Sequence, residues 1–144
     1  MRDGITGAHY PSDFDQRHTI NAFLNYRLSP TINLSLRHSY GSNFPIPGFF
    51  TLRNGQYYLS QQRNQLRLPS FQRTDFRLNK QIERKRWRGV LFVEVMNLFN
   101  NKNQTFDTYN GYDSATGQAR VSLLQLFPIV PAAGWMMDWG GRTR

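Results

Sequence analysis

Apolar and polar residues alternate at every second position in two neighbouring stretches, 17–28 and 32–40. In both stretches the apolar residues occupy even positions, and Phe23 is the one apolar breach at an odd position. Side chains of a β-strand point alternately to opposite faces, so each stretch is predicted to be a strand with one apolar and one polar face. Ser29-Pro30-Thr31 is predicted as a three-residue turn, which brings the two apolar faces to the same side.

A second hairpin is predicted over 71–82 and 87–97. Its apolar positions are even in the first stretch and odd in the second, and the four residues Glu83 to Arg86 provide the even-numbered loop that this change requires. The expected register places Asp75 opposite Glu94. Val90 and Phe92 fall on the polar side. Each stretch is about long enough to cross a bilayer as a tilted strand, with lipid on the apolar face and water on the other.

The two long connections contain asparagine, aspartate and glycine residues that favour turns. Asn54-Gly55 between two short apolar runs predicts a small hairpin in the first connection, 41–69. Asn110-Gly111 and Asp113 to Gly117 predict turns in the second, 97–133. A last short strand is predicted at 134–139.

Composition narrows the class of protein. The 144 residues are 39% hydrophobic and 15% aromatic, and low hydropathy with many aromatics suits a membrane barrel. No apolar run approaches the roughly 18 residues of a spanning helix. The absence of cysteine excludes a disulfide scaffold and thiolate metal sites. A net charge of +9 is compatible with nucleic acid, anionic lipid or a cationic lumen. The polar start Met1 to Gly4 is unlike a signal peptide, so for an exported protein we expect a missing front end.

Loop lengths predict the topology. Transmembrane barrels have short periplasmic turns and long extracellular loops, and the smallest have about eight strands. Five strands alone would leave unpaired edges in lipid, which a bilayer does not tolerate. The predicted fold is therefore all-β: an antiparallel transmembrane β-barrel segment, about five strands of a larger barrel, with two long extracellular loops. Residues 1–16 are predicted as an extracellular loop remnant, 17–139 as barrel strands and loops, and 140–144 as a tail.

Three motifs carry a resemblance to a known family. Asp15 to Thr19 (DQRHT) and Leu68 to Arg77 (LPSFQRTDFR) each open a predicted strand, and Glu94 to Asn100 (EVMNLFN) ends one. In this order and spacing they resemble the C-terminal barrel of TonB-dependent outer-membrane receptors, over about 15–139. The family usually ends on an aromatic residue, whereas here Gly140 to Arg144 follows Trp139.

The resemblance implies a barrel of about 22 strands in the bacterial outer membrane, plugged by an N-terminal domain. It implies energised uptake of scarce nutrients such as siderophores or glycans. The expected partners are outer-membrane lipid, the missing N-terminal strands and plug domain, and through them the TonB energising complex. No cofactor, no metal and no nucleic acid are expected, and no enzymatic activity.

Candidate functional residues follow from the predicted facing. The lumen-facing candidates are Arg27, Arg37, Arg73, Asp75, Arg77 and Glu94. The interfacial girdle candidates are Tyr26, Tyr40, Trp87, Trp135 and Trp139. The candidates for ligand contact in the loops are Tyr57, Tyr58, Tyr109 and Tyr112. The charged lumen residues are interpreted mainly as a network that holds the strands in register, and alternatively as contacts to a plug or substrate.

Two other functions remain open from the sequence. One is a non-transporting outer-membrane barrel, an adhesin or passive pore, which the absence of a plug would distinguish. The other is a soluble basic β-domain that binds nucleic acid through Arg84, Lys85, Arg86 and Arg88. Apolar stripes on a soluble surface would promote aggregation, which argues against that domain. As a periplasmic turn the same basic run is simply solvated.

Overall fold

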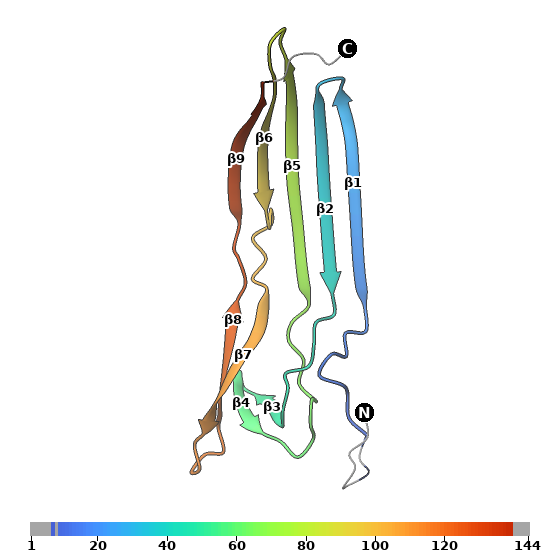
Figure 1. Cartoon of the computed structure of the whole chain (residues 1–144). Helices are drawn as coiled ribbons and strands as arrows, with labels where there is room; N and C mark the ends of the chain where they lie inside the picture. The colour runs from blue at the N-terminus through green and yellow to red at the C-terminus, as the bar shows by residue number, and fades with distance from the viewer. Residues whose placement is uncertain (1–6, 8, 140–144) are drawn as a thin grey trace. The chain divides into compact units, whose positions relative to one another are not determined.

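The chain is all-β, as its alternation predicted (Figure 1). The computed structural model describes residue 7 and residues 9–139. Within those ranges the strands are β1 (Thr19–Ser29), β2 (Ile32–Gly41), β3 (Phe50–Arg53), β4 (Gln56–Leu59), β5 (Phe71–Glu83), β6 (Arg88–Met96), β7 (Gln104–Tyr112), β8 (Ala119–Gln125) and β9 (Val130–Asp138). The same ranges contain no helix that is long and apolar enough to cross a membrane.

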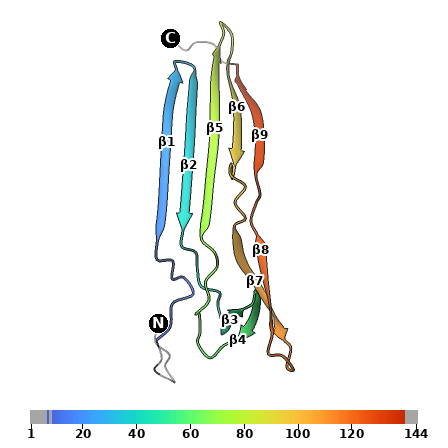
Figure 2. The same ribbon diagram turned by 180° about the vertical axis from the view of Figure 1, so that it is seen from behind.

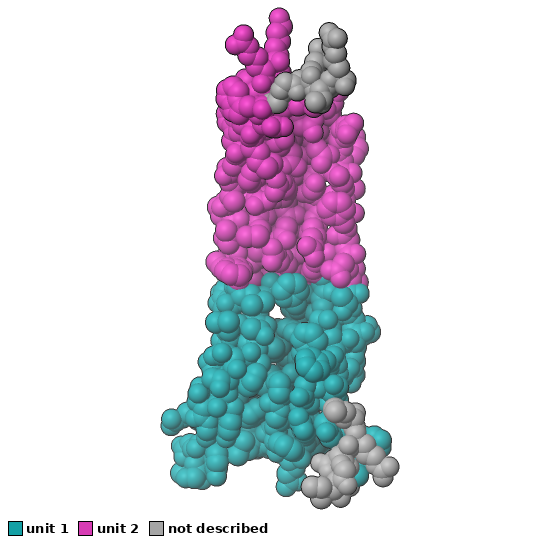
Figure 3. All heavy atoms as spheres, in the orientation of Figure 1, with its two compact units in different colours: residues 1–19, 40–71, 102–126 teal, residues 20–39, 72–101, 127–144 magenta. Residues whose placement is uncertain are grey.

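The strands form three antiparallel sheets. One has five strands in the order β1-β2-β5-β6-β9, and β3–β4 and β7–β8 form one two-stranded sheet each (Figures 1 and 2). The chain divides into two compact units (Figure 3). Unit 1 comprises 1–19, 40–71 and 102–126, and unit 2 comprises 20–39, 72–101 and 127–144. The predicted tail 140–144, and residues 1–6 and 8 of the predicted loop remnant 1–16, lie outside the described residues.

Unit 2 holds most of the five-stranded sheet. Between β1 and β2, Asn25 Oδ1 accepts hydrogen bonds from Asn33 Nδ2 at 2.6 Å and from Ser35 Oγ at 3.4 Å. Asn21 Oδ1 accepts another from Ser39 Oγ at 2.9 Å. The odd positions of the two strands therefore share one face, as the alternation predicted. The turn is tighter than expected, because Ser29 is the last residue of β1.

The strands β5, β6 and β9 also separate apolar from polar side chains. Leu78, Val93 and Ala133 stand in line across the three strands, as do Arg77, Glu94 and Ala132 on the opposite face. The whole apolar row consists of Phe76, Leu78 and Ile82 in β5, Leu91, Val93 and Val95 in β6, and Pro131, Ala133, Trp135 and Met137 in β9. Lys80 is the one charged residue within this row.

The apolar face of β6 is its more exposed face. Leu91 is 41% and Val93 is 44% exposed, whereas Phe92 and Glu94 on the other face are half-buried. The buried hydrophobic residues of the described chain all belong to unit 1: Ile46, Phe50, Leu68 and Ala119. Unit 2, as far as it is described, thus has a sheet without a buried hydrophobic core.

The predicted register of the second hairpin is wrong by two residues. Arg77, not Asp75, lies opposite Glu94, and Glu83 remains in β5 opposite Arg88. The loop still has four residues, now 84–87, so each side chain keeps its predicted face. The observed register sets arginine opposite carboxylate twice, whereas the predicted one set two carboxylates opposite each other, an unfavourable cross-strand pair.

Two further expectations are corrected in the second long connection. It contains the hairpin β7–β8, which the alternation did not predict, and the last strand begins at Val130 instead of 134. Asn110-Gly111 lies inside β7, where the pairing with β8 shifts between Tyr109 and Tyr112. The dipeptide therefore forms a bulge, with Gly111 at φ 88°, and not a turn.

Unit 1 contains the two small hairpins. β3 and β4 pair around Asn54-Gly55, which confirms the predicted hairpin. Leu59 N donates a hydrogen bond to Gly117 O at 3.3 Å, which joins β4 to the turn of the other hairpin. The core of unit 1 includes one residue from each hairpin, Phe50 of β3 and Ala119 of β8. Around its four buried residues, the partly buried ones are Tyr57, Leu66, Phe106, Val121 and Leu123.

Candidate functional site: the charged face of unit 2 and the loop cluster of unit 1

Two partly buried ion pairs occupy the polar face of β5 and β6 in unit 2, in addition to the exposed pair of Glu83 and Arg88 at the end of these strands. Arg77 Nη1 lies 2.9 Å from Glu94 Oε2, and Arg73 Nε lies 2.7 Å from Asp75 Oδ1. The four side chains are between 24% and 37% exposed, so they remain accessible from this face. Each of these carboxylates is paired with an arginine, so the two pairs carry no net charge.

Arg77 is the centre of the larger arrangement on this face. Its Nε donates to Asn79 Oδ1 at 2.9 Å, and its guanidinium carbon lies 4.3 Å from the centre of the Phe92 ring. A Cβ added to Gly134 would lie 2.5 Å from that ring, so the ring covers the glycine of the next strand. Phe92, which breaks the alternation in the sequence, is thus held between a cation and a residue without a side chain.

The predicted lumen-facing residues are brought together only in part. Arg73, Asp75, Arg77 and Glu94 form the two pairs above, and Arg37 adds a favourable electrostatic interaction with Asp75. Arg27 is exposed and makes no ion pair with any described residue. The Arg77–Glu94 pair and the Arg37–Asp75 interaction join neighbouring strands, whereas the Arg73–Asp75 pair lies within β5.

Asn97 fixes the end of this face and was not predicted as a site residue. It is 2% exposed and has a φ of 53°, a conformation that asparagine tolerates better than most residues. Its backbone N–H donates to Asp75 Oδ1 at 3.0 Å. Its side-chain amide donates to Asn101 O at 3.0 Å and to Phe127 O at 3.1 Å. The signal in the sequence was an asparagine at the end of a predicted strand, 87–97, within the motif Glu94 to Asn100.

The girdle candidates lie mostly exposed. In unit 2 the ring centres of Trp87 and Trp135 are 6.0 Å apart, and Trp135 is 54% exposed. Tyr26 is 59% and Trp139 is 72% exposed. Tyr40, which belongs to unit 1, is half-buried.

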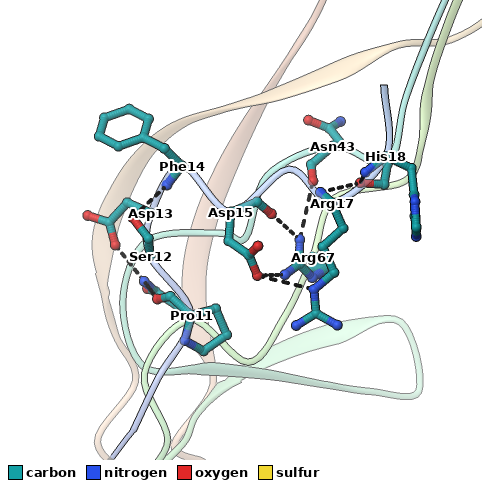
Figure 4. A network of polar contacts seen from close by, with 11 residues as sticks. Pro11, Ser12, Asp13, Phe14, Asp15, Arg17, His18, Asn43 and Arg67 are labelled. Carbon is teal, nitrogen blue, oxygen red and sulfur yellow. Dashed lines mark hydrogen bonds and ion pairs between the residues drawn. The ribbon is translucent and has the colours of Figure 1, made fainter. Parts of the chain in front are cut away.

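A polar network in unit 1 holds the segment before β1 (Figure 4). Arg67 donates to the carboxylate and the backbone carbonyl of Asp15, and to Asn43 O at 3.4 Å. Arg17 Nε lies 3.3 Å from the same carboxylate. Ser42 Oγ accepts hydrogen bonds from the backbone N–H groups of Arg17 and His18 at 3.0 and 3.1 Å. Asp15 and Arg17 belong to a motif noted in the sequence, whereas Arg67 gave no signal there.

The same network affects the titration of Asp15. Desolvation by burial raises the pKa of its carboxyl, but hydrogen bonds and charge attraction from Arg67 and Arg17 outweigh that effect. The resulting pKa lies below its usual value of 3.8. The carboxylate is therefore ionised, and the contact intact, at neutral pH.

Buried asparagines hold the rest of this network. Asn64 is 1% exposed with a φ of 57°, and its amide donates to Pro11 O at 2.9 Å and to the Asp13 carboxylate. Its Oδ1 accepts the backbone N–H of Gly48 at 3.0 Å. Asn43, 7% exposed, donates to Pro69 O at 2.8 Å. These side chains replace the hydrogen bonds that an irregular backbone lacks.

The four loop tyrosines differ in their surroundings. Tyr57 packs against the core of unit 1, and the Tyr109 ring lies 5.3 Å from that of Phe50. Tyr58 hydrogen-bonds Gln56 and lies 6.0 Å from the Arg53 guanidinium. Tyr112 is 55% exposed, which leaves it the most open of the four toward a ligand.

Within the described ranges, no three histidine or carboxylate side chains gather into a group that could hold a metal ion. No protein-family model, no curated protein and no solved structure matches the chain.

Proposed function

We propose that the chain is the C-terminal barrel portion of a TonB-dependent outer-membrane receptor for energised nutrient uptake. Its cargo would be siderophores, glycans or similar scarce molecules. In this proposal the apolar face of the five-stranded sheet contacts lipid, and the face with the two ion pairs lines the lumen. The partners are outer-membrane lipid, further barrel strands with a plug domain, and the TonB complex that acts through the plug.

The observation that carries the proposal is the exposed apolar face of unit 2. A sheet stable in water buries one face against another layer, and a continuous apolar face left open marks an interaction site. Here Leu91 and Val93 are more exposed than Glu94 behind them, and unit 2 has no buried hydrophobic residue among those described. A lipid environment supplies the missing apolar layer, and the polar face then meets water.

The open edges of the sheet support a larger barrel. β1 and β9 are the outermost strands, and no described strand pairs with their outer sides. Unpaired backbone groups are not tolerated in the hydrocarbon region, where only closed barrels satisfy them. Further strands on both sides would satisfy them, and the three motifs described above resemble the receptor family in which such strands and a plug occur.

The DNA upstream of the codon for Met1 in the source genome tests the proposal. An in-frame extension that encodes a signal peptide, a plug-like domain and further alternating strands is expected. An extension with strands but no plug would favour a passive pore or an adhesin instead. A stop codon and a ribosome-binding site directly upstream would contradict the proposal, because five strands cannot close a barrel.

A further inference from the structure

The turn between β5 and β6 carries positive charge without a negative partner. Arg84, Lys85 and Arg86 are exposed, and none of them pairs with a carboxylate among the described residues. The nearest carboxylate along the chain, Glu83, lies 3.6 Å from Arg88 and is neutralised by it. Three adjacent cations thus remain available to an external anion.

Lys80 adds a fourth cation from an unexpected position. It is the charged residue within the apolar row, opposite Leu91, which in turn stands opposite Trp135. It is exposed and has no ion pair within the described ranges. A lysine on such a face can lay its aliphatic stem along apolar surface and carry its ammonium toward a polar boundary.

Two tryptophans mark where that boundary would lie. The rings of Trp87 and Trp135 are 6.0 Å apart, beside the basic turn and within the same unit. Tryptophan is enriched where an apolar layer meets a polar one, because its ring is apolar and its N–H is polar. The β1–β2 and β5–β6 turns lie at the same end of unit 2 (Figures 1 and 2).

We infer that this end of unit 2 binds the phosphates of anionic phospholipid headgroups at a bilayer surface, through Lys80, Arg84, Lys85 and Arg86. The apolar row would contact the acyl chains, the tryptophan pair the interface, and the four cations the headgroup phosphates. Charge complementarity and the continuity of the cations with the apolar row select this ligand. The inference rests on the proposed function, because it takes the apolar face to be the lipid-facing one.

Because five strands cannot close a barrel, the test uses the full-length protein with the further strands that the proposed function requires. It compares partition of that protein into vesicles of phosphatidylcholine alone and vesicles that also contain phosphatidylglycerol. The unaltered chain is expected to prefer the anionic vesicles, and salt should weaken that preference. In R84Q/K85Q/R86Q the preference should fall about a hundredfold, because each cation near an anionic surface contributes roughly fivefold. Partition into neutral vesicles should stay unchanged.

A matched variant separates a local site from net charge. R53Q/K102Q/R120Q also removes three exposed cations, but in unit 1. It should change the preference by less than about threefold, because those charges lie outside the proposed contact. K80L should lower the preference by about fivefold without weakening partition into neutral vesicles.

The outcomes distinguish this inference from the proposed function. Failure to enter either type of vesicle would count against the membrane barrel itself. Equal partition into both types, or equal losses in the two triple variants, would leave the barrel standing and overturn the headgroup site. Salt-dependent binding to RNA or DNA that R84Q/K85Q/R86Q abolishes, without any vesicle preference, would overturn it in favour of a nucleic-acid surface.

Discussion

We expect replacement of a single valine of β6 by arginine to destabilise the protein more on the apolar face of the sheet than on the polar face. Val93 lies on the apolar face between Leu78 and Ala133, and Val90 lies on the polar face between Gln81 and Met136. Val93→Arg and Val90→Arg remove the same side chain from the same strand and introduce the same charge. The two variants therefore differ mainly in what surrounds the new guanidinium.

The stability lost by placing arginine at position 93 depends on whether the apolar face meets lipid or water. Val93 is 44% exposed in the chain by itself, so in water an arginine there would extend into solvent. Surface substitutions of that kind usually change the free energy of unfolding by about 0.5 kcal/mol or less. On the lipid face of a barrel, arginine costs about 2–4 kcal/mol near the midplane. We therefore expect Val93→Arg to lower the free energy of unfolding by about 2 kcal/mol or more beyond the loss caused by Val90→Arg.

The assay is equilibrium unfolding by denaturant of the full-length protein, with the further strands that close the proposed barrel, in lipid vesicles, followed by tryptophan fluorescence. The midpoint for Val93→Arg should move to clearly lower denaturant concentration, with Val90→Arg close to the unaltered chain. Equal midpoints for the two variants, or a larger loss for Val90→Arg, would refute the assignment of the faces.

Three further predictions concern contacts within each unit. Gly134→Ala should lower the free energy of unfolding by about 1–3 kcal/mol, because its Cβ would lie 2.5 Å from the Phe92 ring. Addition of Phe92→Leu should restore most of that loss in a denaturant titration, and no restoration would refute the clash. Asn97→Ala should cost about 1–3 kcal/mol through the loss of its buried hydrogen bonds, and Asn97→Gly should cost less because glycine accepts the φ of 53°. If thermal unfolding showed the same loss of stability for Asn97→Ala and Asn97→Gly, the backbone conformation of Asn97 would have no role. The lowered pKa of Asp15 means that its contact with Arg67 contributes stability above the usual value of 3.8, and that this contribution disappears as the pH falls through the lowered pKa. Backbone hydrogen exchange in 11–17, corrected for intrinsic rates, should therefore accelerate on acidification. In Asp15→Asn that pH dependence should disappear. If both proteins responded to acid in the same way, the contact of Asp15 with Arg67 could not be the cause.

The long strands could be predicted because their alternation is regular. β1, β2, β5 and β6 each begin and end within two residues of the predicted bounds. β7 was missed because its pairing shifts twice, and each bulge reverses which side the following residues face. A period of two then disappears from the sequence although the strand is present.

The last strand was shortened in the prediction for a related reason. β9 contains Pro131 and Gly134, both of which argue against a strand interior in a sequence. Proline is tolerated at the beginning of a strand, and Pro131 is the second residue of β9. Gly134 is needed because the Phe92 ring occupies the place of its side chain.

The candidate site was predictable as a face but not as a set of contacts. A register shift of two residues leaves every side chain on its face, so the alternation cannot tell whether Asp75 or Arg77 lies opposite Glu94. The contacts of Arg67 with Asp15 and of Asn97 with Phe127 join residues far apart in the chain. No local pattern in the sequence contains that information.

The most direct test of the account measures which side chains of β6 meet lipid. The chain has no cysteine, so in the full-length protein, with any cysteine outside the chain replaced, single cysteines at positions 90, 91, 93 and 94 can each carry a fluorophore without background labelling. In vesicles with a quencher attached to the acyl chains, labels at 91 and 93 should be strongly quenched. Labels at 90 and 94 should instead be quenched by a water-soluble agent. The same quenching by lipid at all four positions, or none at any, would contradict a sheet with one face in the bilayer.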